Sequence, residues 1–391
     1  MVATLKDRKL LTLSNTFPNF SRNFTAGNFI KNQLDGVNEA FSEVTVISPV
    51  LKTFGRSKRD RLCKDYSYSN VQVNYPRVFF WRTIDNRLKV IRRIIKEKNI
   101  DFDLIHAHYG TMGHIIEPLV QEYMKPLINS FYGYDAYLYK YDSLYYERLF
   151  EHSTLILTLS DHMSERMEGL GCSPHKIKKL HIGIDTDTFK PRESISKKKE
   201  GDKLKILIVA NFVEKKGILD AIHAFSNVYK KFKNIHLDIL GTGPLKTRIE
   251  ELIHTLDLQS VVQILNNLAT KNPRQTVLNY MQNCDIFLLP SVKAANGDSE
   301  GTPVVLMEAS ACGKPCITTQ HSGNPEVVID GENGITVPER DIESLSDGLT
   351  QLIEDEEKRN RLGRNGRKHI CAEFDSKVQS KRLIEIYEKI L

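Results

Sequence analysis

The chain has 391 residues, more than a single hydrophobic core ordinarily holds, so two domains are expected. Hydrophobic residues make up 40% of it and charged residues 27%, as in globular proteins that fold in water. No apolar run approaches the ~20 residues that cross a bilayer, and the first residues become charged too early for a signal peptide. These features exclude a membrane-spanning protein and predict a cytosolic one.

The positive charge is concentrated in one stretch of the first half. The formal net charge is +6, but residues 52–98 alone hold 14 basic and 4 acidic residues. Such a patch suits an anionic partner, namely a membrane surface, a lipid phosphate or a nucleic acid, or else it is a solvated face. The sequence contains no zinc-finger or helix-turn-helix signature, so no nucleic-acid partner is expected.

The six cysteines do not form a metal-binding pattern. They stand at positions 63, 172, 284, 312, 316 and 371, and only Cys312 and Cys316 lie close together. Structural zinc sites need paired cysteines or histidine partners at fixed spacing. Reduced, mostly buried thiols and no metal are therefore expected.

Short apolar runs alternate with helical periodicity through the first half of the chain. Ile84, Leu88, Ile91 and Ile95 recur at the spacing of one helical face. Strands alternating with helices predict βαβ units and a doubly wound parallel sheet. In chain order, strands are predicted at 9–17, 43–50, 103–110, 126–135 and 154–160, with helices at 26–41 and around 84–95.

A polar segment near 190–204, rich in lysine and containing Pro191 and Gly201, predicts a linker, after which the same α/β pattern restarts. Residues 376–391 predict a terminal amphipathic helix. We therefore expect domains at 1–192 and 203–375, with 376–391 packing back on the first. Strands are predicted at 205–212, 235–243, 261–266, 286–291, 315–320 and 334–338, and helices at about 217–232, 245–256, 273–283 and from Thr302 onward.

Two carboxylates mark the loop and helix after the strand at 286–291. Gly301 allows a close backbone approach, and Thr302 and Pro303 are typical helix-start residues. The following helix start is suited to binding a phosphate. Glu300 would lie on the rim of that site, and Glu308, among apolar neighbours, would reach the same region, where a carboxylate can accept hydrogen bonds from ribose hydroxyls. The alternative is two solvated surface acids.

Further candidates stand where other strands end, which is where open α/β sheets bind ligands. Lys215 and Lys216 follow the strand at 205–212, where a lysine can neutralise phosphate or can simply be exposed. The segments HAHYG (106–110) and FYGYD (131–135) end two predicted strands of the first half, and HSGNPE (321–326) follows one of the second. No third metal ligand accompanies the two histidines of HAHYG.

Together these motifs make the chain resemble the retaining, GT-B-fold nucleotide-sugar glycosyltransferases of family 4, the group 1 glycosyltransferases, especially those that build extracellular polysaccharides. The resemblance covers almost the whole length. It is most specific in the E-x7-E motif EGTPVVLMEASACGKP, and it extends to VEKKG, HSGNPE, the HAHYG and FYGYD pair and LGCSPHKIKKLHIGIDTDTFKP (170–191).

The resemblance implies two facing Rossmann-like domains and a division of roles between them. The N-terminal domain binds a glycan or lipid-linked acceptor, and the C-terminal domain binds a nucleotide-diphosphate sugar. It implies retention by front-face attack with the leaving diphosphate as base, and no required metal or cofactor. Expected at the reacting sugar are Glu300, Asp135 and Tyr132; at the donor Glu308, Lys216, Asn211, Gly301, Thr302, Pro303 and Val304; and on the acceptor side His108.

The chain departs from the family pattern at two of these positions. Ala210-Asn211 replaces the usual Gly-Arg, which removes a cation from the diphosphate site, and Tyr132 replaces a histidine. These changes leave open a catalytically silent homologue that binds a partner or glycan. A nucleotide-sugar epimerase of the same fold also remains open, as does, less readily, a two-carboxylate glycoside hydrolase. The basic stretch 52–98 predicts peripheral attachment to the inner face of the cytoplasmic membrane.

Overall fold

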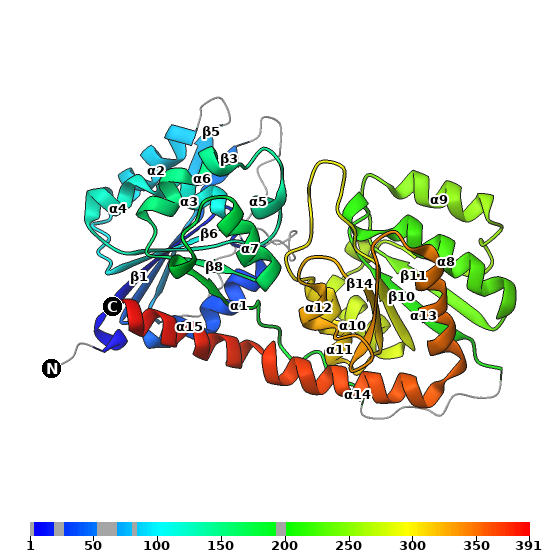
Figure 1. Ribbon diagram of the computed structural model, residues 1–391. Coiled ribbons are helices and arrows are strands. Elements are labelled where there is room, and N and C mark those ends of the chain that lie inside the picture. The colour runs from blue at the N-terminus through cyan, green and yellow to red at the C-terminus, as the bar shows by residue number, and fades with distance from the viewer. Residues whose placement is uncertain (1–3, 19–26, 53–68, 80–83, 193–200) are drawn as a thin grey trace. The chain divides into compact units, whose positions relative to one another are not determined.

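The computed structural model describes residues 4–18, 27–52, 69–79, 84–192 and 201–391. It divides into two compact units. Unit 1 comprises Met1–Gly183 with Ser376–Leu391, and unit 2 comprises Ile184–Asp375. Each unit is a parallel sheet with helices packed against it (Figure 1).

Much of the basic stretch 52–98 lies outside the described residues, as does Cys63. The membrane-binding hypothesis for that stretch therefore stays a prediction. Within the described part of this stretch, the basic residues of α2 (Ile84–Glu97) include Arg92, which pairs with Glu122 at 2.6 Å.

Unit 1 contains a seven-stranded parallel sheet within the described residues, in the order β4-β2-β1-β6-β7-β8-β9. Its strands are β1 (Lys9–Ser14), β2 (Glu43–Ile47), β4 (Val71–Asn74), β6 (Leu104–His108), β7 (Leu127–Ser130), β8 (Leu155–Thr158) and β9 (Ile177–Lys179), and the short pair β3 (Val50–Lys52) and β5 (Arg77–Phe79) lies apart from it. The helices are α1 (Asn28–Val37), α2, α3 (Gly110–Ile116), α4 (Pro118–Tyr123), α5 (Tyr134–Tyr137), α6 (Ser143–His152), α7 (Asp161–Gly169) and α15 (Ser376–Ile390). Three short 3-10 turns are η1 (Leu5–Asp7), η2 (Asn38–Ala40) and η3 (Pro174–Lys176).

The strands of this sheet are buried on both faces, which explains their continuous apolar runs. Alternate residues of β1 enter two different cores, with Leu11 beside α2, α3 and α6 and Leu10 beside α1 and α15. Helix α15 packs against α1. The two helices approach closely at Gly36, where an added Cβ would lie only 1.9 Å from Ser380 Oγ. The C-terminal helix is thereby part of the core of unit 1.

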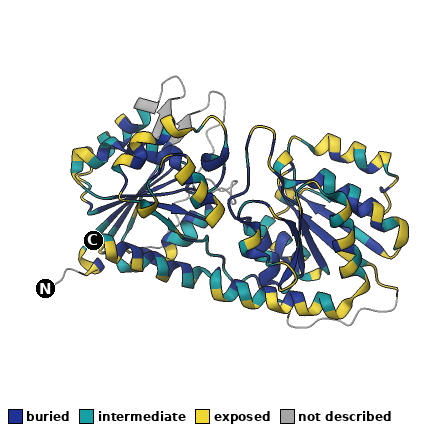
Figure 2. Ribbon diagram, in the orientation of Figure 1, coloured by how far each residue is buried: buried dark blue, intermediate teal, exposed yellow. Residues whose placement is uncertain are grey.

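Unit 2 contains a six-stranded parallel sheet within the described residues, in the order β12-β11-β10-β13-β14-β15. Figure 2 shows its strands buried and its helices exposed on their outer sides. The strands are β10 (Leu204–Val209), β11 (Ile235–Leu240), β12 (Val262–Leu265), β13 (Ile286–Leu289), β14 (Cys316–Thr319) and β15 (Gly334–Val337). The helices are α8 (Ile218–Lys231), α9 (Lys246–Thr255), α10 (Pro273–Asn283), α11 (Val304–Ala311), α12 (Asn324–Val327), α13 (Ile342–Glu354) and α14 (Glu356–Glu373), with the turns η4 (Glu214–Lys216) and η5 (Asn267–Ala269).

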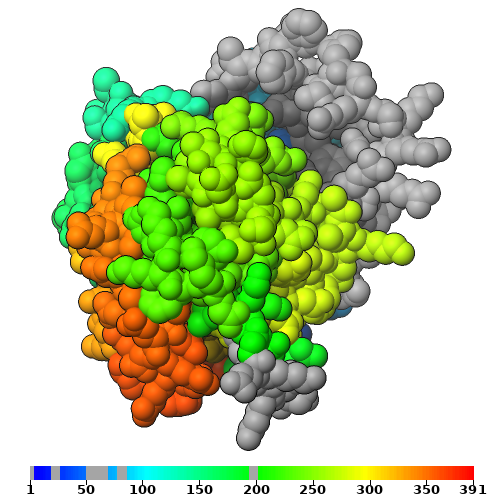
Figure 3. All heavy atoms as spheres, turned by 90° about the vertical axis from the view of Figure 1, so that its right-hand side faces the viewer, coloured from blue at the N-terminus to red at the C-terminus, as the bar shows by residue number. Residues whose placement is uncertain are grey.

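The outer helices of unit 2 pack side by side, with α8 in contact with both α9 and α13. Figure 3 shows this face, where green side chains of α8 and α9 adjoin orange side chains of α13. A cavity of about 520 Å³ lies here, lined among others by Asp220, His223, Arg248 and Arg340. Its lining also includes Glu214, Gly217 and Val292, which follow β10 and β13, so it borders the strand ends that concern the candidate site.

The predicted fold class is confirmed, and the observed boundaries correct several predicted elements. The strand predicted at 126–135 ends at Ser130, because Gly133 has φ 147° and the helix α5 starts at Tyr134. The helix predicted from Thr302 begins at Val304, with Pro303 as its N-cap in an extended conformation. Helix α14, which is mostly polar, was not predicted at all.

Candidate functional site

The strand order of unit 2 places its candidate residues at the point where the order of the sheet reverses. Strand β10 lies between β11 and β13, and these two neighbours lead away in opposite directions along the sheet. Ligands of open α/β sheets bind outside the carboxyl ends of the strands at such a point. The loop after β10 carries Lys216, and the loop after β13 carries Glu300.

These two residues form a shielded ion pair. Lys216 Nζ lies 2.7 Å from Glu300 Oε1, and the side chains are only 14% and 9% exposed. Burial by itself raises the pKa of Glu300, but Lys216, and then Lys215, outweigh it and hold that pKa below its usual value. Glu300 is therefore a carboxylate at neutral pH, and Lys216 is held beside the loop that leads into α11.

A glycine accounts for the closeness of the two loops. Gly217 has φ +61° and is the N-cap of α8, and a Cβ there would meet the carbonyl oxygen of Pro290 at 1.8 Å. Only glycine tolerates both the left-handed backbone and this approach. The start of α8 can therefore lie against the end of β13, which brings the η4 lysines beside Glu300.

Lys215 contacts different residues from Lys216. Its ammonium contacts Asp298 Oδ1 at 3.0 Å and the carbonyl oxygen of Ser299 at 3.2 Å. Lys215 thereby stabilises the residues just before Glu300, and Lys216 binds Glu300 itself, so the two lysines contact adjacent parts of one loop. The sequence did not distinguish between the two.

Glu300 is also held through its backbone by the HSGNPE segment after β14. Its N–H donates to His321 Nε2 at 3.1 Å, and Ser322 Oγ donates to its carbonyl oxygen at 2.6 Å. Because Nε2 accepts, the proton of the neutral His321 ring is on Nδ1, which donates to Glu339 Oε1 at 2.6 Å. His321 and Glu339 are therefore positioning residues that the sequence analysis missed; only the place of HSGNPE at a strand end pointed toward them.

Glu308 lies in the second turn of α11, half-buried, with apolar neighbours. Burial raises the pKa of Glu308 to about 8, although Arg274 opposes the shift. Within the described residues its carboxyl group makes no hydrogen bond and no ion pair. A surface glutamate would not be desolvated in this way, so this side chain is suited to a ligand that supplies hydrogen-bond donors.

The start of α11 presents backbone donors to the same region. No side chain caps this helix, and Pro303 precedes its first residue, Val304. An uncapped helix start leaves N–H groups and a partial positive charge for an anion. Gly301 and Thr302, both buried, complete the turn into the helix, and Asn211 is exposed at the end of β10. The structure thus brings most of the predicted donor residues to one edge of one sheet.

In unit 1 the predicted site residue Asp135 is fully buried, and both oxygens of its carboxylate accept hydrogen bonds. Its carboxylate accepts from the N–H groups of Gly110 (2.8 Å), Gly133 (2.9 Å) and Tyr132 (3.0 Å). Burial raises the pKa of Asp135 to about 6, and these backbone donors oppose the shift. This carboxylate fixes the loop after β7 to the start of α3, an arrangement that favours a positioning role over contact with a sugar.

The histidines of HAHYG form a stacked pair, with ring centroids 4.3 Å apart. His106 uses both ring nitrogens, one with Tyr387 Oη at 2.7 Å and one with Ser130 Oγ at 2.8 Å. His108 Nδ1 lies 2.6 Å from Tyr132 Oη. Burial lowers the pKa of both histidines, that of His106 to about 3, so the pair is neutral.

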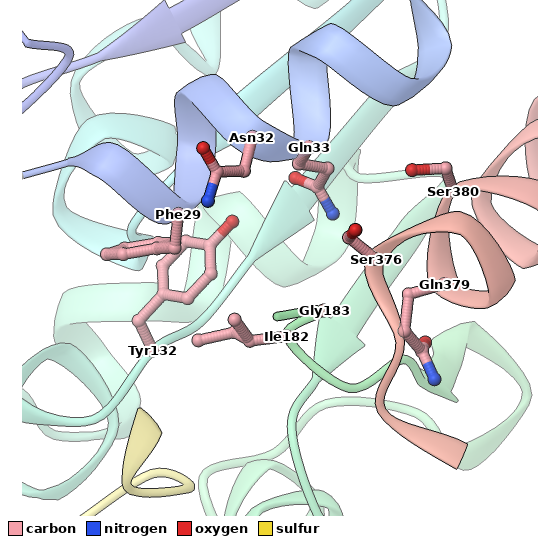
Figure 4. A pocket seen from close by; sticks show the side chains of 9 residues that line it. All are labelled: Phe29, Asn32, Gln33, Tyr132, Ile182, Gly183, Ser376, Gln379 and Ser380. Carbon is pink, nitrogen blue, oxygen red and sulfur yellow. The ribbon is translucent and has the colours of Figure 1, made fainter. Parts of the chain in front are cut away.

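Tyr132 borders a small cavity of about 20 Å³, room for one water molecule. Figure 4 shows its ring beside Phe29, with Gln33 and Ser376 farther along the cavity wall. The phenol group can donate or accept a hydrogen bond, but burial raises the pKa of Tyr132 and keeps it neutral. It cannot act as the cation that the usual histidine would supply.

No cluster of three or more His, Cys, Asp or Glu residues able to hold a metal ion occurs in the part of the chain that the structure describes. Among the described helices, none has both the length and the apolar character needed to cross a bilayer. Of the five cysteines that the structure describes, four are buried and Cys371 is partly exposed, and all five are free thiols.

Comparison with known proteins identifies the class to which this fold and site belong. The model of the glycosyl transferases group 1 matches residues 189–369, and that of glycosyltransferase family 4 matches residues 26–188. The chain belongs to the group 1 glycosyltransferases, with a GT-B fold, as its motifs predicted.

Two relatives illustrate this membership. The chain is 31% identical to WcaL of Salmonella typhimurium, a glycosyltransferase assigned to colanic acid biosynthesis, over 74% of this chain and 71% of WcaL. It is 30% identical to the amylovoran biosynthesis glycosyltransferase AmsK of Erwinia amylovora, over 74% of this chain and 70% of AmsK.

Solved structures show the same fold at low sequence identity. Anabaena HepE, solved with UDP and glucose, is 14% identical with a TM-score of 0.74, covering 98% of this chain and 100% of HepE. The sucrose-phosphate synthase of Thermosynechococcus elongatus is 15% identical with a TM-score of 0.75, covering 98% of this chain and 99% of that enzyme.

Proposed function

We propose that this glycosyltransferase moves a hexose or similar sugar from a nucleotide-diphosphate donor to a glycan or lipid-linked acceptor, with retention of the anomeric configuration, in cell-surface or extracellular polysaccharide biosynthesis. The relatives named for colanic acid and amylovoran biosynthesis support the pathway class, and the UDP complexes of HepE support the donor class.

The observation that carries this proposal is the arrangement around the uncapped start of α11. The helix start and Lys216 provide donors and positive charge for a diphosphate, and Glu308 provides an acceptor for the ribose hydroxyls. Glu300 precedes both the helix start and Glu308 in the chain, pairs with Lys216, and would face the sugar. A diphosphate that takes a share of the Lys216 ammonium weakens its pairing with Glu300, which frees this carboxylate to accept from sugar hydroxyls.

The mechanism needs little acid-base chemistry from the described residues of unit 2. Glu300 is kept ionised by Lys216, and the diphosphate leaving group takes up the acceptor's proton as it departs. Helix α11 and Lys216 stabilise the charge that develops on that leaving group. Retention and independence of divalent metal are both part of the proposal.

The test is a panel of nucleotide sugars with release of UDP or GDP as the readout, run with and without EDTA. We expect release from one donor, unchanged by EDTA, and loss of donor binding in Glu308→Gln. Product NMR with an accepted glycan should show the donor's anomeric configuration. Unchanged donor binding in Glu308→Gln, or an inverted product, would overturn the corresponding part of the proposal.

The departures Asn211 and Tyr132 favour a second candidate, a silent homologue that binds a partner or glycan without transferring sugar. The same panel separates the two, since a silent homologue releases no diphosphate from any donor. An epimerase would convert the donor without an acceptor, which product analysis detects.

Association with the inner face of the cytoplasmic membrane is also proposed, through the basic stretch 52–98. Each basic residue near an anionic surface contributes about 1 kcal/mol. Flotation with vesicles rich in phosphatidylglycerol should carry the enzyme upward, and 0.5 M salt should release it. Flotation that does not depend on the anionic lipid would contradict this mode of attachment.

A further inference from the structure

Tyrosine is concentrated in one segment of unit 1 that the donor chemistry does not use. Seven of the chain's 15 tyrosines lie within residues 132–146. Two of them, Tyr137 and Tyr146, are buried and pack in the core. The others are half-buried or exposed, which a simple core does not explain, since phenylalanine or leucine would fill a core without a hydroxyl group.

Four of these outer tyrosines join with the buried Tyr109 into a continuous track of rings. Tyr109 and Tyr132 have centroids 4.9 Å apart, and Tyr109 stacks on Tyr134 at 5.3 Å. From Tyr134 the track passes to Tyr141 at 6.5 Å and from Tyr141 to Tyr145 at 5.0 Å. We define these five residues as the aromatic track.

Each end of the track is closed by a further ring. Phe29 of α1 lies beside Tyr132 (Figure 4), with ring centroids 4.7 Å apart. His114 of α3 stacks on Tyr145 with centroids 4.0 Å apart and an interplanar angle of 23°. The rings of the track come from three places that follow β6 or β7 in the chain, namely the start of α3, the segment around α5 and the start of α6. The track therefore begins at the carboxyl edge of the sheet, and its first ring is the predicted site residue Tyr132.

The chemistry of the track matches neutral sugars. The apolar C–H face of a pyranose ring packs on the electron-rich face of an aromatic ring, and the phenol groups exchange hydrogen bonds with sugar hydroxyls. Four of the five rings are half-buried, so each has a fixed orientation while part of it stays accessible. Burial raises the pKa of Tyr145 to about 12, which keeps its hydroxyl protonated.

We propose that the aromatic track binds an acceptor that is already an oligosaccharide, with successive neutral sugar units lying along Tyr132, Tyr134, Tyr141 and Tyr145. This inference rests on the proposed function and narrows its acceptor from any hydroxyl compound to a chain of several sugars. The terminal sugar lies beside Tyr132, and units farther from the reaction contact Tyr141 and Tyr145.

A membrane surface is the competing occupant. Tyr139 and Leu144 are 60% and 79% exposed, and Lys140 lies over the Tyr141 ring at 4.9 Å, a combination that also suits a lipid interface. The track itself argues for a glycan, because four of its rings are half-buried and all of them lie against one another in tilted or stacked pairs instead of projecting. The two occupants predict different results in the same experiment.

The experiment uses an array printed with fragments of bacterial polysaccharides, from monosaccharides to octasaccharides, probed with the full-length enzyme in the presence of UDP. We expect binding to at least one neutral tetrasaccharide or longer fragment and none to its monosaccharide. The double variant Tyr141→Leu/Tyr145→Leu, which keeps apolar bulk but removes the rings, should bind at least tenfold more weakly. Tyr280→Leu, a half-buried tyrosine of unit 2, is the matched control and should bind as the wild type does.

A thermal melt of each variant confirms that the fold is retained, and the single variant Tyr141→Leu serves if the double variant does not fold. No binding to any fragment, or equal binding to a monosaccharide, overturns the inference. So does flotation on phosphatidylglycerol vesicles that the double variant loses while glycan binding is unchanged, since the track would then contact lipid. UDP calorimetry on the same preparation separates this outcome from failure of the proposed function, because nucleotide binding uses residues of unit 2.

Discussion

The carboxyl edges of the two sheets carry opposite kinds of chemistry. In unit 2 the loops after β10 and β13 bring together Lys216 and Glu300, and the helix that follows carries Glu308, whose carboxyl group has no hydrogen-bond partner among the described residues. In unit 1 the end of β6 and the loops after β6 and β7 bring together two neutral histidines, tyrosines and the fully satisfied Asp135. One fold thus provides a charged surface and a neutral aromatic one.

This difference in charge between the two sheet edges indicates which kind of ligand each unit can bind. A diphosphate needs fixed positive charge and free backbone donors, which the unit 2 site supplies. A neutral glycan needs flat apolar faces and hydroxyl partners, which the aromatic track supplies. Four substitutions test this contrast.

The largest expected effect comes from removing the cation in unit 2. Lys216→Met leaves Glu300 buried without its partner, so the free energy of unfolding should fall by about 3–5 kcal/mol. Adding Glu300→Gln to that variant should restore most of the loss. Urea titrations measure both values. Lys246→Met, in the exposed pair with Glu250, is the control and should change the free energy by less than about 0.5 kcal/mol. Additive losses in the double variant would show that the two residues are not coupled.

The next largest effect on the free energy of unfolding is expected from a substitution in unit 1. Asp135→Asn places an amide N–H₂ group or a single carbonyl against three backbone donors, so at least one buried N–H loses its partner. The expected loss is about 2–3 kcal/mol in the free energy of unfolding. Asp142→Asn is the matched control, because asparagine caps a helix as well as aspartate does. A loss in Asp135→Asn no larger than in the control would remove the positioning role from Asp135.

A smaller effect depends on pH. The folded pKa of Glu308 is raised to about 8 from an ordinary value near 4.5, so its contribution is fully present below the ordinary value and is lost as pH rises toward 8. Glu308→Gln should therefore be more stable than the wild type at pH 8.5, by on the order of 2 kcal/mol, with a smaller gain at pH 5. Thermal unfolding at both pH values measures the difference, with Glu250→Gln as the exposed control. A gain that does not depend on pH would show that Glu308 is not desolvated.

The smallest effect is expected from a substitution that restores the missing cation of the diphosphate site. Asn211→Arg places a guanidinium at the exposed end of β10, where the family pattern has one, and should tighten UDP or GDP binding about tenfold, or about 1.4 kcal/mol. Calorimetry measures the affinity, and Asn227→Arg on α8 adds the same charge elsewhere on unit 2. Equal tightening by both variants would mean that net charge, not position 211, sets the affinity.

The sequence predicted what depends on local pattern. Buried parallel strands read as apolar runs, and the strand ends therefore placed Glu300, Lys216 and Tyr132 at sheet edges before any coordinates. Helix α14 was missed because it is mostly polar, and the boundary at Ser130 was missed because FYGYD is as aromatic as a strand. Local composition does not report where the backbone turns.

The missed parts of the site depend on contacts between distant residues. The chain from Glu339 through His321 to the Glu300 backbone joins three strand ends, and nothing in HSGNPE announces it. The neutrality of His106 and His108 follows from burial, and the use of all three backbone donors by Asp135 follows from loop geometry. The roles of individual site residues at the sugar stay predictions.

The central claim is that Lys216 and the start of α11 hold a nucleotide diphosphate, and calorimetric titration of UDP and GDP into the wild type and Lys216→Met/Glu300→Gln tests it most directly. This double variant removes the cation without leaving a buried charge behind. The account predicts one nucleotide bound per wild-type chain, and a loss of about 100-fold or more in affinity in the double variant with its fold retained. Equal affinity in the two proteins, or no binding of either nucleotide to the wild type, would contradict it.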